Sequence, residues 1–153
     1  MLRACALMSR AVVAVADTDR AADAARGLAT AGISGALVRD GSGALVGVVS
    51  QADLANTKLS GTRRHPTVSD VMTADLIGVY AEDPALAAAR EMALHDIHRV
   101  VVWDADGEVV GLVSSLDVVK AIARGAEFDP AASDVAVMRT RAPGVPKGRP
   151  RYR

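Results

Sequence analysis

The stretch Gly47-Val48-Val49-Ser50-Gln51-Ala52-Asp53 returns 64 residues later as Gly111-Leu112-Val113-Ser114-Ser115-Leu116-Asp117. The same offset holds upstream of this stretch, because 17 of the 47 positions between Leu7 and Asp53 are identical to their partners without a gap. A unit repeated at a fixed period folds into equivalent structural copies. The sequence therefore predicts two equivalent units and, with them, two equivalent candidate sites.

Both copies show the same order of strand-like and helix-like segments. β-Branched residues at 11–15 and 75–79 are typical of a strand. Two more strands are predicted at 35–39 and 44–49, and again at 99–103 and 108–113, each pair joined by a short turn that contains Asp and Gly. With a helix after the first strand and a closing helix, clearest at 115–124, the order is β-α-β-β-α in each copy.

The ends of the first helix in each copy carry helix signals. Asp19 is expected to cap one helix and Asp83 the other, with Pro84 at the first helical position of the second. Gly32 is expected to end the first of these helices.

Composition indicates a compact protein of a reducing compartment. Half of the 153 residues are hydrophobic, which suffices for a core without disulfides or metals. The single cysteine, Cys5, cannot form an internal disulfide, and no apolar segment is long enough to span a bilayer. We therefore expect a cytoplasmic protein.

The zero net charge conceals an uneven distribution. Residues 138–153 carry six basic side chains and no acidic one, so residues 1–137 hold 12 basic and 18 acidic residues. The basic segment also contains three prolines and two glycines, a composition that buries too little apolar surface to order itself. The sequence predicts a disordered basic tail that could contact nucleic acid or an acidic protein.

The Ser-x-x-Asp pattern can bind a nucleotide or cap a helix. A serine between a strand and a helix lies beside free backbone N–H groups, where the helix dipole favours a phosphate. An Asp three residues later can accept hydrogen bonds from ribose hydroxyls. The same spacing also matches a capping box, and both interpretations stay open. We interpret Gly47 and Gly111 as positions that let a ligand approach the backbone.

The Gly-hydrophobic-x-Ser-x-x-Asp ending, the openings Leu7-Met8-Ser9 and Val71-Met72-Thr73, and Ile97-His98-Arg99 resemble the cystathionine-β-synthase (CBS) domain. Two in tandem resemble a Bateman module, over about residues 7–124. The resemblance implies an α/β (α+β) fold of two pseudo-twofold related β-α-β-β-α repeats. We assign 1–6 to an N-terminal extension, 7–57 to the first repeat, 58–68 to a linker, 69–125 to the second repeat, and 126–153 to a C-terminal extension.

The resemblance also implies two clefts for adenosine-containing ligands, each formed by both repeats. The first is expected to contain Ser50, Asp53, Asp75, Ile77, Ile97, His98 and Arg99. The second is expected to contain Ser114, Asp117, Ile33, Ser34, Gly35, Ala11 and Val13. His98 and Arg99 match a pair that contacts phosphates in nucleotide-sensing relatives, so the cleft of Asp53 is expected to be the better nucleotide site.

These observations predict a stand-alone regulatory CBS pair rather than an enzyme. Its effector is expected to be AMP, ADP, ATP or S-adenosylmethionine, with no obligatory cofactor, no catalytic residues and no metal ligands. We expect a homodimer, with exposed apolar residues of the last helix such as Leu116, Val119 and Ile122 as contacts, and an unidentified regulated partner. The alternative is a dimeric interaction scaffold that binds no ligand and whose basic tail contacts nucleic acid or an acidic protein.

Overall fold

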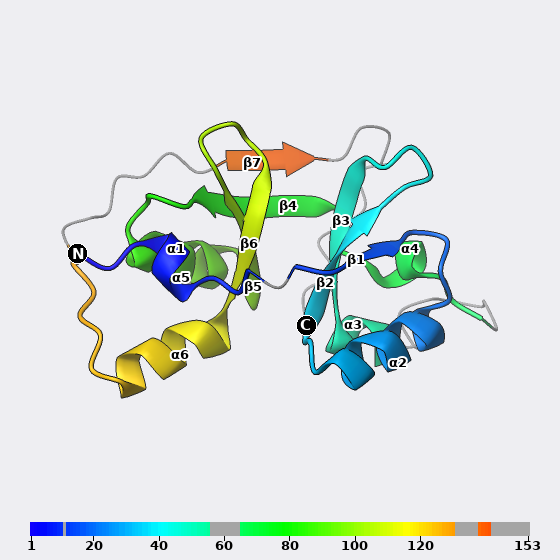
Figure 1. Cartoon of the computed structure of the whole chain (residues 1–153), viewed down its shortest axis with the longest axis horizontal. Helices are drawn as coiled ribbons and strands as arrows, with labels where there is room; N and C mark the ends of the chain where they lie inside the picture. Colours follow the sequence, from blue (N-terminus) through cyan, green and yellow to red (C-terminus); the bar gives the residue numbers. More distant parts are fainter. Residues whose placement is uncertain (11, 56–64, 131–137, 142–153) are drawn as a thin grey trace. The chain divides into compact units, whose positions relative to one another are not determined.

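The computed structural model describes residues 1–10, 12–55, 65–130 and 138–141. They form two compact units, each shown with its labels in Figure 1. The first-repeat unit is built from Val13–Leu76, and the second-repeat unit from Met1–Val12 and Ile77–Thr140. The repeat predicted from the sequence is therefore present as two structural units.

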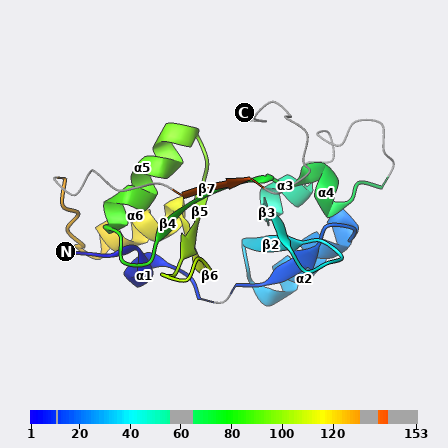
Figure 2. The same cartoon turned by 90° about the horizontal axis from the view of Figure 1, so that it is seen from above.

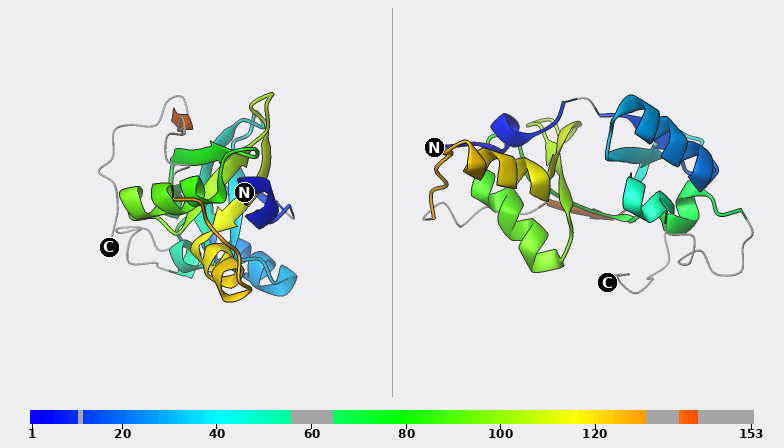
Figure 3. Two further views of the ribbon diagram at one scale, coloured as in Figure 1. Left: turned by 90° about the vertical axis from the view of Figure 1, so that its left-hand side faces the viewer. Right: turned by 90° about the horizontal axis from the view of Figure 1, so that it is seen from below.

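The first-repeat unit contains a three-stranded sheet in the order β1-β2-β3. Its elements are β1 (Ala14–Ala16), α2 (Ala21–Ala31), β2 (Gly35–Arg39), β3 (Leu45–Ser50), α3 (Gln51–Ala55) and α4 (Val68–Val71). β1 is parallel to β2, and β2 is antiparallel to β3. Helices α2 and α3 lie side by side (Figure 3). The buried core of this unit includes Leu28, Val38, Val49, Leu54 and Val68.

The second-repeat unit has the same layout with one added strand. Its elements are α1 (Ala4–Leu7), β4 (Asp75–Tyr80), α5 (Ala85–His95), β5 (Arg99–Trp103), β6 (Val109–Ser114), α6 (Ser115–Ala123) and β7 (Met138–Arg141). The boundary between the units falls within β4, after Leu76, and within β7, after Thr140. The sheet order is β6-β5-β4-β7, with β4 parallel to β5 and β5 antiparallel to β6. The core of this unit includes Val79, Ala88, Val100, Val102 and Val113.

Strand β7 comes from the segment that the sequence predicts to be a disordered tail. It lies along β4 at the edge of the sheet (Figure 2). The remainder of that tail, residues 142–153, lies outside the described residues.

Each unit is completed by a short helix that the sequence places at the start of the other repeat. Helix α1 lies in the second-repeat unit, where Ala4 N donates to Asp83 O at 2.8 Å and Ala85 N donates to Leu2 O at 2.8 Å. Helix α4, 64 residues later, lies in the first-repeat unit, where its Val68 N donates to Asp19 O at 2.8 Å. Ala4 and Val68 are fully buried. The chain therefore passes from one unit to the other after each of these helices.

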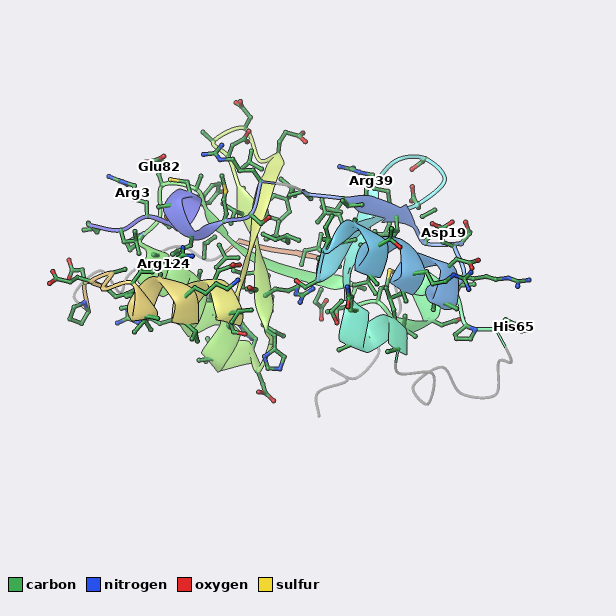
Figure 4. All side chains as sticks on the ribbon, turned by 60° about the horizontal axis from the view of Figure 1, so that its bottom comes forward. Arg3, Asp19, Arg39, His65, Glu82 and Arg124 are labelled. Atoms are coloured by element: carbon green, nitrogen blue, oxygen red, sulfur yellow. The ribbon has the colours of Figure 1, made fainter. Side chains whose placement is uncertain are left out.

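The start of the second-repeat unit is also held by an ion pair. Arg3 Nη1 lies 3.3 Å from Glu82 Oε2 and donates to the Glu82 carbonyl, and the two side chains lie together in Figure 4. Both side chains are at least half exposed, so this pair contributes about 0–1 kcal/mol.

The helix starts differ from the prediction. Asp19 and Asp83 are not N-caps: each instead accepts a hydrogen bond from the backbone N–H three residues earlier, Ala16 at 3.1 Å and Tyr80 at 2.7 Å. Pro84 is the N-cap residue of α5 rather than its first helical residue. The two carboxylates therefore stabilise the turns that follow β1 and β4, and the helices begin after them.

The predicted helix end at Gly32 is confirmed. Gly32 has φ 67°, and Ile33 N donates to Leu28 O at 2.9 Å, as in a Schellman motif. In the second-repeat unit Asp96 occupies the equivalent position with φ 52°. One motif therefore ends both helices, once with glycine and once with a residue that has a side chain.

Candidate functional site

The first Ser-x-x-Asp turn links β3 to α3. Ser50 N donates to Asp53 Oδ2 at 2.8 Å, and Asp53 N donates to Ser50 Oγ at 3.0 Å. This reciprocal pair is a capping box, so the cap interpretation is correct. Both side chains are only half-buried.

The second turn repeats this geometry between β6 and α6. Ser114 N donates to Asp117 Oδ2 at 2.8 Å, and Asp117 N donates to Ser114 Oγ at 3.2 Å. The Ser114 hydroxyl also donates to Asp117 Oδ2 at 2.7 Å, a bond that the first turn does not show. Within the described part of the chain, the capping bonds of both Asp residues use Oδ2 and leave Oδ1 to accept from another donor. The cap therefore does not exclude a ligand.

The two glycines ahead of these turns have a structural role that our interpretation of the sequence missed. A Cβ at Gly47 would lie 2.8 Å from Met72 Sδ and 2.8 Å from Thr73 O, and a Cβ at Gly111 would lie 2.6 Å from Met8 Sδ. The space that a side chain would need is thus filled at Gly47 by the chain that follows α4, and at Gly111 by the chain that follows α1. Our interpretation that they admit a ligand is wrong. Identity at Met8 and Met72 in both repeats was the signal for this contact.

Each turn lies beside the loop that precedes the middle strand of its own unit. Gly35 pairs with Ser50 across β2 and β3, and Arg99 pairs with Ser114 across β5 and β6. Gln51 N donates to Ser34 O at 3.0 Å, and in the second-repeat unit Ser115 N donates to the carbonyl of His98 at 2.9 Å. The side chains of Ser34 and His98 are exposed, and that of Arg99 is half-buried.

The other predicted site residues differ in how accessible they are. Asp75 is exposed at the start of β4, whereas Ile77 is 7 % exposed and belongs to the core of the second-repeat unit. Val13 and Ile33 are half-buried against the core of the first-repeat unit, and Ile97 against that of the second. Ala11 lies outside the described residues.

Each predicted set is divided between the two units. Ser50, Asp53 and Asp75 belong to the first-repeat unit, while Ile77, Ile97, His98 and Arg99 belong to the second. Likewise Ser114 and Asp117 belong to the second-repeat unit, and Val13, Ile33, Ser34 and Gly35 to the first. The combination of residues from both repeats stays a prediction.

The described residues were also searched for a metal site and for a membrane-spanning helix. No three His, Cys, Asp or Glu side chains in this part of the chain lie close enough to hold a metal ion. None of the helices built from the described residues combines the length and the hydrophobicity needed to cross a bilayer.

Sequence reasoning missed the side chain of Gln51, whose Nε2 donates to Ile33 O at 2.7 Å. Its signal was the change from Gln51 to Ser115 inside an otherwise matched motif.

Solved structures of similar fold contain adenosine-based ligands. A CBS domain pair in complex with 5′-methylthioadenosine and S-adenosyl-L-methionine is 25% identical, with a TM-score of 0.67 over 78% of this chain and 98% of that one. A CBS domain protein from Pyrobaculum aerophilum complexed with AMP is 27% identical, with a TM-score of 0.65 over 76% of this chain and 89% of that one.

Sequence comparison finds a partial match to a curated enzyme and a match of both repeats to one domain family. A homoserine O-acetyltransferase from Methanosphaerula palustris is 29% identical over 119 residues, which are 78% of this chain but only 24% of that enzyme. The chain thus spans about a quarter of the length of this curated relative. The sequence model of the CBS domain matches residues 4–59 and 68–124, and the mixed α/β fold of two repeats confirms the predicted fold class. The chain belongs to the CBS domain family.

Proposed function

We propose that this CBS pair is a regulatory protein that binds an adenosine-containing ligand, such as AMP, ADP, ATP or S-adenosylmethionine, at its Ser-x-x-Asp turns. The observation that carries the proposal is the duplicated turn, in which the capping bonds of Asp53 and Asp117 engage Oδ2 and leave Oδ1 for a ribose hydroxyl. Hydrogen bonds to a charged group contribute about 1.5–3 kcal/mol each. Relatives of 25% and 27% identity that were solved with such ligands support it.

The two turns are proposed to differ in affinity for phosphate. In the arrangement implied by the family, the turn of Asp53 is completed by His98 and Arg99, whereas the turn of Asp117 is completed by Ser34 and Gly35. A guanidinium binds phosphate through charge-assisted hydrogen bonds, which the second set cannot supply. The site of Asp53 is therefore the nucleotide site of this proposal, and that of Asp117 suits a less charged ligand.

A second part of the proposal is that the chain acts as a homodimer and signals by association with another protein. Helix α6 has no buried residue, and Leu116, Val119 and Ile122 on it are 57%, 57% and 58% exposed. Their spacing of three residues places them along one side of the helix. A partner that covers these side chains would bury apolar surface, and each Å² buried stabilises the complex by about 25 cal/mol.

A thermal-shift screen of AMP, ADP, ATP and S-adenosylmethionine tests the binding proposal. A ligand at 100 times its dissociation constant stabilises the folded state by about 2.7 kcal/mol, which is a shift of several degrees for a chain of this size. If none of the four shifts the melting temperature at millimolar concentration, the alternative of an interaction scaffold without a ligand is favoured.

A further inference from the structure

Met8 and Met72 occupy equivalent positions at the ends of the two short helices. Met8 is the C-cap residue of α1, where its N–H donates to Ala4 O at 3.1 Å. Met72 is the C-cap residue of α4, where its N–H donates to Val68 O at 2.9 Å. Both side chains are half-buried, Met8 against the core of the second-repeat unit and Met72 against that of the first. Each unit therefore contains one of these methionines, just before the chain leaves that unit.

Each sulfur fills the space that a side chain would need on a glycine of the neighbouring strand. A Cβ on Gly111 in β6 would lie 2.6 Å from Met8 Sδ, 2.8 Å from its Cγ and 3.0 Å from its Cβ. A Cβ on Gly47 in β3 would lie 2.8 Å from Met72 Sδ and 2.8 Å from Thr73 O. Each methionine thus packs directly onto the backbone of a strand, which leaves little room for a further atom between the sulfur and the glycine.

The residue after each methionine is joined to the same strand by two backbone hydrogen bonds. Ser9 N donates to Leu112 O at 2.8 Å, and Leu112 N donates to Ser9 O at 3.2 Å. In the first-repeat unit, Thr73 N donates to Val48 O and Val48 N donates to Thr73 O, both at 2.9 Å. Leu112 and Val48 directly follow the two glycines. We call each methionine, its glycine and the adjoining pair of hydrogen bonds a crossing contact.

We propose that Met8 and Met72 are oxidation sites at which a peroxide, such as hydrogen peroxide, opens the two crossing contacts. The thioether sulfur donates an electron pair to one oxygen of hydrogen peroxide, so that an S–O bond forms and the O–O bond breaks. The other oxygen leaves as water and carries both protons. The sulfur is thereby oxidised to a sulfoxide and the peroxide is reduced. Methionine sulfoxide reductases reverse the change. This inference goes beyond the proposed function and does not depend on a ligand.

A sulfoxide does not fit where the thioether fits. Oxidation makes the side chain polar and adds an oxygen to a sulfur that already fills the space over its glycine. Burying that polar oxygen without a hydrogen-bond donor costs free energy. At Met72 the space is shared with the carbonyl oxygen of Thr73, which accepts hydrogen bonds and cannot donate one. The oxidised side chain should therefore turn toward solvent, and the pair of hydrogen bonds beside it should weaken.

Two other methionines of the chain serve as internal references for reactivity. Met1 is 76% exposed, whereas Met92 is 5% exposed in the core of the second-repeat unit. The half-buried thiol of Cys5 is a further target of peroxide. Every protein in the experiment therefore carries Cys5→Ala and Met138→Leu, so that oxidation at these two positions cannot contribute, and the chain with only these two changes is the reference protein.

Peptide mass spectrometry of the peroxide-treated reference protein assigns each added oxygen to a methionine. We expect Met8 and Met72 to be oxidised more slowly than Met1 and faster than Met92. The oxidised protein should melt roughly 2–8 °C lower than the untreated protein, and a methionine sulfoxide reductase should restore the melting temperature. Oxidation of Met1 while Met8 and Met72 stay intact would overturn the proposal. Oxidation of both without a change in melting temperature would overturn it equally.

Single leucine variants locate the effect of each methionine. Leucine fills a similar volume and contains no sulfur, so both variants should keep the fold. After oxidation of Met72→Leu, amide hydrogen exchange should be faster at Ser9 and Leu112 but unchanged in the crossing contact of the first-repeat unit. Met8→Leu should show the opposite pattern. Faster exchange in both units of either variant would contradict the assignment of one crossing contact to each methionine.

The combined variant Met8→Leu/Met72→Leu is the matched control. Its melting temperature should not change in peroxide, and a decrease as large as that of the reference protein would overturn the proposal. If a leucine variant does not fold, the exchange rates of the amides of Ser9, Leu112, Val48 and Thr73 in the reference protein, before and after oxidation, decide the question. Rates that are the same in both states would overturn the proposal.

Discussion

Met72 Sδ lies 2.8 Å from the position that a Cβ on Gly47 would occupy, and Thr73 O lies equally near. Glycine is therefore required at 47 by the chain leaving α4. Gly111 stands in the same relation to Met8, but there the near atoms all belong to a flexible side chain.

Gly47→Ala should destabilise the protein by about 1–3 kcal/mol, because overpacking against a backbone carbonyl forces a shift of the chain. Gly111→Ala should cost less, since a rotamer change moves Met8 Sδ and Cγ away and leaves only its Cβ, at 3.0 Å, as a tight contact. Gly41→Ala is the control, with nothing within 4 Å of the added methyl. Urea denaturation measures all three, and equal stability of Gly47→Ala and Gly41→Ala would contradict the contact.

Asp96→Gly should stabilise the second-repeat unit. Asp96 ends α5 with φ 52°, a left-handed conformation that costs most residues with a side chain about 1–2 kcal/mol relative to glycine, and Asp less than most. Part of this gain is offset by the greater entropy of glycine in the unfolded chain, so we expect a net gain of roughly 0.5–1 kcal/mol. Gly32→Asp, the reverse change at the equivalent position, should lower the unfolding free energy. A variant Asp96→Gly that is less stable than the unmutated protein would argue against this account.

The turn at Asp40 should contribute a pH-dependent stabilisation. Hydrogen bonds from the Ser42 hydroxyl and backbone N–H, and from Ala44 N, lower the pKa of Asp40 below its ordinary value of 3.8. Because the folded-state pKa is lowered, this stabilisation is present above pH 3.8 and is lost as the pH falls through the lower folded value. Asp40→Asn should therefore lower the melting temperature at pH 7 but not at a pH below the lowered folded-state pKa of Asp40, where both side chains are neutral. An equal difference at both pH values would exclude the carboxylate charge as the cause.

Self-association through α6 predicts that Val119→Lys gives a monomer. The side chain is 57% exposed, so the lysine should leave the fold intact while placing a charge among Leu116 and Ile122. Light scattering should find about twice the 15.8 kDa chain mass for the unmutated protein and for the control Leu94→Lys, which changes an exposed residue of α5. A Val119→Lys dimer would rule out this face.

Much of the fold follows from local sequence signals. Apolar runs between turn residues predict the bounds of β2 and β5 correctly, Gly35–Arg39 and Arg99–Trp103, because both strands are almost fully buried and therefore largely apolar. The Ser-x-x-Asp turns were likewise located by their duplication.

Other features depend on contacts that local patterns do not encode. Helices α1 and α4 are four residues each, too short for a hydrophobic period, and the unit in which each one lies is decided by long-range backbone bonds such as that from Val68 to Asp19. Asp19 and Asp83 were predicted to be caps because an Asp before an apolar helix fits that role, but the preceding turn offers each carboxylate a nearer donor.

Loss of the capping bonds should affect both units alike. Asp53→Ala and Asp117→Ala each remove the side chain of a capping box, at a cost of about 0.5–2 kcal/mol in the absence of ligand. Differential scanning calorimetry of the two ligand-free variants should show similar decreases in melting temperature. A decrease confined to one of them would show that the two turns are not structurally equivalent.

The central claim is that the turn of Asp53 binds an adenine nucleotide, and isothermal titration with AMP tests it most directly. Because Asp53→Ala and Asp117→Ala should cost the fold equally, a difference between their affinities for AMP reports on binding. The unmutated protein should bind AMP, and both Asp53→Ala and Arg99→Ala should weaken binding by roughly 10- to 150-fold, the loss of one charge-assisted hydrogen bond. Asp117→Ala should weaken it less, because its proposed site has no cation for the phosphate. Equal affinities of Asp53→Ala and the unmutated protein, or no heat of binding from any of these proteins at millimolar AMP, would contradict the claim.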